Sequence, residues 1–192
     1  ISVLFDEKGD DVYSGTYLTE AAAIAGVSIL GDFAGSDHYI ARTFCQAAAF
    51  FGLAILADTQ SRTPKDPKHL NASCDRYSAS TYAQGTGLPR GFGLLIDAYG
   101  NDTYITGSHQ KDFRDPDRAS LSLSQGFAFG LRPYSTPYGA AGGFGILADY
   151  AGHDTYIGEY FCQGSSYWFG FGGLYDEAGD DTYVCGRYSQ GA

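Results

Sequence analysis

The sequence predicts an all-β protein, a parallel β-solenoid (β-helix) of about six to seven coils with about 26 residues in each coil. Three observations predict this fold class. One pattern, Gly-x-Gly-x-Leu-x-Asp-x-x-Gly-x-Asp-x-Tyr, recurs along the chain and is complete from Gly170 to Tyr183. Its parts alternate with the period of two that strands show. Each position of the pattern holds the same residue type in most units. Stacked coils would therefore place residues of the same type directly above one another.

The aspartate that ends the first part of the pattern reveals the period. Most steps from one unit to the next are close to 26 residues; one is longer by about half a period, and one is about twice the period. The first aspartate column is Asp6, Asp32, Asp58, Asp97, Asp149 and Asp176. The second aspartate column is Asp11, Asp37, Asp75, Asp102, Asp154 and Asp181. The tyrosine column is Tyr13, Tyr39, Tyr77, Tyr104, Tyr156 and Tyr183.

Each unit has the same order of elements. A strand such as Gly170–Asp176 comes first, with its small residues on one face. A tight turn follows up to Asp181, in which glycine supplies positive φ and the Asp side chains can bond backbone N–H groups. The Thr182-Tyr183-Val184 stretch favours a second strand, and the piece ending in Gln190-Gly191 closes the coil.

Seven positions after the tyrosine, four units carry a Gln and the first unit carries Glu20; the four are Gln46, Gln84, Gln163 and Gln190. Stacked Gln amides would form a hydrogen-bonded ladder along the solenoid axis. The alanines that follow Glu20 and Gln46 leave a helix open as an alternative, but Gly and Ser take their places in later units. Small residues are the common feature, which favours a tightly packed coil edge.

The chain, residues 1–192, is expected to be one repeat domain and a fragment of a longer array, because it opens inside a unit and carries no polar cap. Two insertions interrupt the repeat, at about 59–73 and about 108–141. The second could hide a degenerate coil around Ser124-Gln125-Gly126. Most of the Lys and Arg residues lie between Arg62 and Arg132, and insertions in solenoids often carry binding function. Ordinary solvated loops are the alternative.

Composition excludes several classes of protein. The net charge of −10 argues against a nucleic-acid partner, which needs a basic surface. The many aromatic residues exclude a disordered acidic tail. No apolar run is long enough for a membrane span. The four cysteines form no Cys-x-x-Cys pair and do not predict a zinc site.

Stacked coils would bring like charges together in both aspartate columns. Carboxylates at that spacing must be protonated, bonded to backbone N–H groups, or bridged by a cation. Calcium is the natural bridge, because it accepts six to eight oxygen ligands in flexible geometry. The candidate ligands in the first aspartate column are Asp32, Asp149 and Asp176.

Three turns carry a resemblance to a known repeat. They are Tyr99-Gly100-Asn101-Asp102-Thr103-Tyr104, Ala151-Gly152-His153-Asp154-Thr155-Tyr156 and Ala178-Gly179-Asp180-Asp181-Thr182-Tyr183. They resemble the second half of the calcium-binding nonapeptide of RTX (hemolysin-type) β-rolls. The resemblance implies calcium held between turns by Asp11, Asp37, Asp102, Asp154 and Asp181. The leading Gly-Gly is missing and the turns occur once per coil, so backbone-capping aspartates remain the alternative.

We expect a structural or adhesive solenoid segment of an exported or surface protein, extracellular and stabilised by calcium. It would act as a rod, filament or scaffold, through self-assembly or contact with another surface protein. The alternative is a carbohydrate-binding or polysaccharide-cleaving β-helix, which an outward tyrosine column or aromatic residues beside the insertions would favour. Arg114 or Arg118 would then be the basic catalytic candidate. The sequence contains no catalytic motif, so an enzyme is the less favoured interpretation.

Overall fold

The computed structural model describes residues 1–59, 73–107, 110–113, 115–117, 120–134 and 137–192. Every regular element among these residues is a β-strand, which confirms the all-β class. The alanine-rich pieces form β4 (Ala22–Ile24) and β8 (Ala48–Phe50), so the helical alternative is wrong. In the described part of the chain there is no helix that could cross a membrane.

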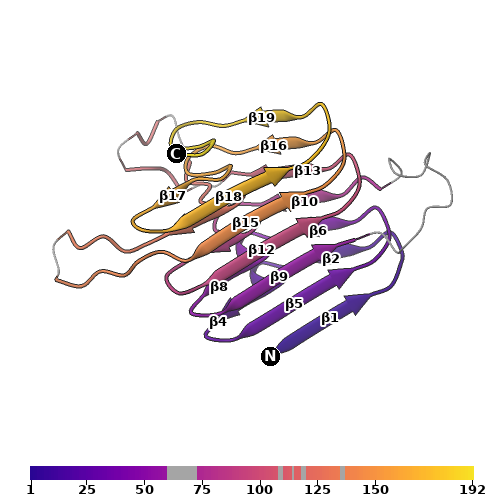
Figure 1. Ribbon diagram of the computed structural model, residues 1–192, viewed down its shortest axis with the longest axis horizontal. Helices are drawn as coiled ribbons and strands as arrows, with labels where there is room; N and C mark the ends of the chain where they lie inside the picture. Colours follow the sequence, from indigo (N-terminus) through magenta and orange to yellow (C-terminus); the bar gives the residue numbers. More distant parts are fainter. Residues whose placement is uncertain (60–72, 108–109, 114, 118–119, 135–136) are drawn as a thin grey trace.

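Strands from successive coils pair in parallel and stack into long sheets (Figure 1). The first sheet contains β1 (Ser2–Asp6), β5 (Val27–Asp32), β9 (Leu53–Asp58), β12 (Phe92–Asp97), β15 (Phe144–Asp149) and β18 (Phe171–Asp176). The second sheet contains β2 (Val12–Ser14), β6 (His38–Ile40), β10 (Arg76–Ala79), β13 (Thr103–Thr106), β16 (Thr155–Ile157) and β19 (Thr182–Val184). The third sheet contains β4, β8, β11 (Thr86–Gly87), β14 (Phe127–Phe129) and β17 (Ser166–Tyr167). A short pair, β3 (Tyr17–Thr19) and β7 (Thr43–Cys45), completes the first two coils.

The pairing register reproduces the sequence columns. Along the first sheet Asp6 pairs with Asp32, and Asp32 pairs with Asp58, without any shift. Along the second sheet Tyr77 lies between the tyrosines of the coils on either side. The parallel β-solenoid is therefore confirmed, and the six strands of the first sheet mark six coils.

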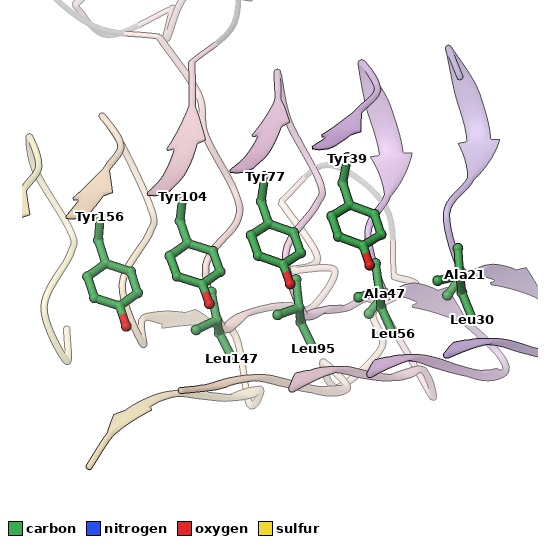
Figure 2. Packing of buried hydrophobic residues seen from close by; sticks show 10 residues of the cluster. All are labelled: Ala21, Leu30, Tyr39, Ala47, Leu56, Tyr77, Leu95, Tyr104, Leu147 and Tyr156. Atoms are coloured by element: carbon green, nitrogen blue, oxygen red, sulfur yellow. The ribbon is translucent and has the colours of Figure 1, made fainter. Parts of the chain in front are cut away.

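The core is built from two stacked columns, leucine and tyrosine. Strands of the first sheet alternate, so that in β12 Gly93, Leu95 and Asp97 point inward. The tyrosine rings lie opposite and stack in parallel, with centroids 4.7 Å apart for Tyr39 and Tyr77 (Figure 2). These buried rings exclude the tyrosine column as an outward sugar-binding strip.

The second insertion is divided by part of the solenoid. Residues 120–130 belong to the fourth coil, where the Gln125 amide donates to the carbonyl oxygens of Tyr104 at 3.1 Å and Ile157 at 3.0 Å. Antiparallel bridges, Lys111 with Ser120 and Leu131 with Ala140, close a loop on each side. The segment around Gln125 is thus no additional coil. The first insertion, residues 60–72, lies outside the described residues.

The Gln residues of the middle coils form clamps, and the expected ladder occurs at the two ends of the column. There Gln46 donates from Nε2 to Glu20 at 2.9 Å, and Gln190 donates from Nε2 to Gln163 at 3.3 Å. Gln84 donates from Nε2 to the carbonyl oxygen of Tyr77 in its own coil, at 3.1 Å, and to that of Ile105 in the next, at 3.3 Å. Its backbone is left-handed, with φ of 53°. The Gln84 amide therefore joins two coils through backbone carbonyl groups, while its Oε1 is buried without a hydrogen-bond partner.

Candidate metal centre

Both aspartate columns line the inside of the turn that joins the first sheet to the second. The first column ends the strands of the first sheet, and the second column precedes the strands of the second sheet (Figure 1). In the middle coils these side chains are inaccessible to solvent: Asp97 and Asp102 are each 1% exposed. Glycine makes the turn possible, because a Cβ at Gly35 (φ 158°) would collide with the carbonyl oxygen of Gly9.

In the first aspartate column, Asp32, Asp97 and Asp149 have partners for both carboxylate oxygens. Oδ1 of Asp149 accepts the N–H of Ala151 at 3.2 Å, which caps the turn. Oδ2 of Asp149 accepts the hydroxyl of Tyr104 from the preceding coil at 2.7 Å. In the corresponding hydrogen bond two coils earlier, the Tyr39 hydroxyl donates to Oδ2 of Asp58 at 2.8 Å. The columns are thus bonded from coil to coil, a connection that the sequence pattern did not predict.

The second aspartate column is only half satisfied. From the second coil onward, Oδ1 of each residue accepts the backbone N–H of the aspartate one coil earlier, at 2.6 Å from Asp75 to Asp102 and 2.7 Å from Asp102 to Asp154. The remaining oxygen, Oδ2, is buried without a hydrogen-bond partner in Asp11, Asp37, Asp102 and Asp154. Asp75 differs, because the Ser73 hydroxyl donates to it at 2.9 Å. In Asp37, Asp102 and Asp154, a backbone N–H therefore accounts for one carboxylate oxygen, and the other has no partner.

The two columns together form triads of carboxylates whose ligand oxygens lie within 4.8 Å of one another. The triads are Asp6–Asp11–Asp32, Asp37–Asp58–Asp75, Asp75–Asp97–Asp102, Asp102–Asp149–Asp154 and Asp154–Asp176–Asp181. All eight predicted ligands are among them. Asp6, Asp58, Asp75 and Asp97 were not proposed as ligands, although they occupy the same columns and could have been found from the register.

Burial makes charge on these side chains unfavourable. Desolvation, together with the charges of neighbouring aspartates, raises the pKa of Asp37 to about 7 and that of Asp58 to about 8. Desolvation likewise raises the pKa of Asp102 to about 10. In the described part of the chain, no Lys, Arg or His forms an ion pair with either column. Without a cation, these carboxyls hold protons near neutral pH.

The arrangement fits a hard divalent cation. Calcium binds carboxylate and carbonyl oxygens, and three carboxylates between successive coils offer such a set. The unpartnered Oδ2 atoms of Asp37, Asp102 and Asp154 point to a ligand more directly than the acidic cluster alone. A bound cation would give these oxygen atoms a partner and would neutralise the repulsion between the carboxylates within each triad.

Fold and site together define a repeat β-solenoid with an acidic interior edge. Comparison of the chain with protein-family models, curated protein sequences and solved structures found no match. The resemblance to RTX repeats therefore stays a prediction.

Proposed function

We propose that this chain is a structural β-solenoid segment of an exported or surface protein, stiffened by calcium bound between its coils. The observation that carries the proposal is the buried, unpartnered Oδ2 of Asp37, Asp102 and Asp154 beside other carboxylates. Calcium would displace the protons held there and add cross-links between coils that hydrogen bonds and core packing already join. Millimolar extracellular calcium suits sites of modest affinity, which supports an extracellular setting.

Thermal unfolding with and without calcium tests this proposal. At a calcium concentration about 100 times the Kd, one site adds about 2.7 kcal/mol, which raises the Tm of a chain of this size by roughly 5–10 °C. Asp154→Asn should reduce the shift, because Asp154 contributes to two triads. Asp180→Asn is the matched control, since Asp180 lies on the exposed side of a turn and belongs to no triad. If calcium leaves the Tm of the unmodified chain unchanged, the aspartates are turn caps alone.

In this proposal the coils form the rigid scaffold, and their surfaces mediate assembly or partner binding. Repeat proteins use such extended surfaces because every coil presents the same positions at a fixed spacing. Contact could run through the loops of the fourth coil or through stacking of coils end to end.

A second candidate, carbohydrate binding, is favoured by an aromatic hollow of about 440 Å³ beside the loops of the fourth coil. Its ring-bearing lining residues are Tyr82, Phe113, Phe129, Tyr134, Phe161 and Tyr167. Sugar rings stack on such aromatic walls, while the tyrosine hydroxyls would orient them. Saturation-transfer NMR with a panel of soluble oligosaccharides should show contacts that Tyr167→Leu abolishes. The proposed catalytic residues Arg114 and Arg118 lie outside the described residues.

A further inference from the structure

The outer face of the first sheet is apolar along its whole length. Inward residues of β9 are Ala54, Leu56 and Asp58, so Leu53, Ile55 and Ala57 point outward. Outward positions of the six strands, matched by register, hold Val3, Phe5, Val27, Ile29, Gly31, Leu53, Ile55, Ala57, Phe92, Leu94, Ile96, Phe144, Ile146, Ala148, Phe171, Gly173 and Tyr175. None of these residues is charged, and the Tyr175 hydroxyl is the one polar side-chain group among them.

The solenoid does not require such a face, as its second sheet shows. The outward positions of the second sheet form two register columns. One is mostly polar and contains Val12, His38, Arg76, Thr103, Thr155 and Thr182. The other is mixed and contains Ser14, Ile40, Ser78, Ile105, Ile157 and Val184. The strands of the two sheets share the same coils and the same pairing. The apolar character of the first sheet is therefore a property of that surface and needs its own explanation.

Solvent reaches this apolar face. Val3, Phe144 and Phe171 are each about half exposed, at 51%, 53% and 53%. In Figure 1 the six arrows of the first sheet run side by side without another described element in front of them. Six strands at about 4.8 Å spacing and six residues at about 3.3 Å rise cover roughly 550 Å². A continuous apolar patch of that size marks an interaction surface.

We propose that a second copy of this chain covers the first sheet, so that two solenoids pack sheet against sheet. Two such faces would bury roughly 1,100 Å², just above the minimum for a specific interface. Sheets pack face to face at about 10 Å when side chains of both faces interdigitate. The uncharged face lets two copies meet despite a net charge of −10 on each. The contact would be isologous, as in most homodimers.

This inference deepens the assembly part of the proposed function and does not depend on calcium. Sedimentation equilibrium of the purified chain at micromolar concentrations measures it directly. We expect twice the monomer mass of 20.5 kDa. Leu94→Lys, in the middle of the apolar face, should weaken dimerisation at least tenfold. Ile40→Lys is the matched control: Ile40 is an exposed isoleucine of β6 in the second sheet, and its replacement should leave the dimer intact.

Three results would overturn the inference. A monomer at all concentrations would show that the face is not self-complementary. A series of higher masses would indicate end-to-end stacking of coils, because head-to-tail contacts do not close. A dimer that survives Leu94→Lys would place the interface elsewhere. Unfolding curves of each variant separate these outcomes from loss of fold, and calcium-dependent stabilisation of a monomer would leave the metal proposal standing while refuting this one.

Discussion

In metal-free buffer, this solenoid should lose stability as the pH rises from 4.5 to 7. Desolvation raises the pKa of Asp37 and of Asp154 to about 7 in the folded chain, above their ordinary value of 3.8. A group whose pKa is raised by folding favours the protonated, folded state. Its contribution is complete below pH 3.8 and is lost as the pH rises through about 7.

The size of the effect follows from the number of protons retained. Each carboxyl that is protonated when folded and ionised when unfolded changes the free energy of unfolding by about 1.4 kcal/mol per pH unit. Asp37 and Asp154 lie in coils that do not touch, so their contributions add. Between pH 4.5 and 6 the two together lose about 4 kcal/mol. Water at the turn screens part of this effect, so a loss of about 2–4 kcal/mol is expected.

Urea unfolding followed by far-UV circular dichroism, at several pH values in metal-stripped buffer, measures this loss. A parallel series in millimolar calcium should be flat or should rise with pH, because the cation competes with protons for the same oxygens. The reasoning is refuted if the metal-free chain becomes more stable from pH 4.5 to 7, as proteins with exposed or salt-bridged carboxylates do. A flat metal-free series would show that water hydrates the columns fully.

Two pairs of substitutions test the contacts that join the coils. Tyr104→Phe should cost about 1–3 kcal/mol, because it removes the hydroxyl that bonds buried Asp149, whereas Tyr183→Phe in the exposed last coil should cost less; urea unfolding compares them, and equal costs would contradict the argument. Burial raises the pKa of Glu20 to about 7, so Glu20→Gln should stabilise the chain by about 1–3 kcal/mol at pH 8 and little at pH 5. The reverse change, Gln84→Glu, should destabilise the chain at pH 8. If both substitutions changed the free energy of unfolding in the same direction at pH 8, burial of the carboxyl could not be the cause.

Register and core could be predicted from the sequence because they depend on repetition. A column such as Leu56, Leu95 and Leu147 is continuous in one stacking register and is broken in any other. The same argument applies to the tyrosines and to both aspartate columns. Spacing along the chain was a weaker guide where loops intervene, and it suggested an additional coil at Gln125 that the fourth coil itself contains.

The metal triads were only partly predictable. The columns placed aspartates of successive coils together, but the different roles of their oxygens depend on backbone direction. Oδ1 of Asp154 reaches the N–H of Asp102 in the preceding coil, while Oδ2 of the same residue remains unpartnered. Likewise, the left-handed backbone at Gln84 turns its amide toward carbonyl groups instead of toward another Gln. Residue types alone do not specify these orientations.

The sequence by itself determined the repeat, the stacking register and the residues that share each column, because these follow from periodicity. Only the tertiary structure decided which face of the first sheet is interior. Hydrophobicity alone would bury Phe92, Leu94 and Ile96, yet the structure buries Gly93, Leu95 and Asp97. At Gly93 the coil interior is too narrow for any side chain, because an added Cβ would collide with the backbone carbonyl oxygens of Thr86 and Ala47. At Asp97, the Tyr77 hydroxyl and the Tyr99 N–H donate hydrogen bonds to the buried carboxylate. The more apolar face of the strand therefore remains on the outside of the coil, where it can make contacts.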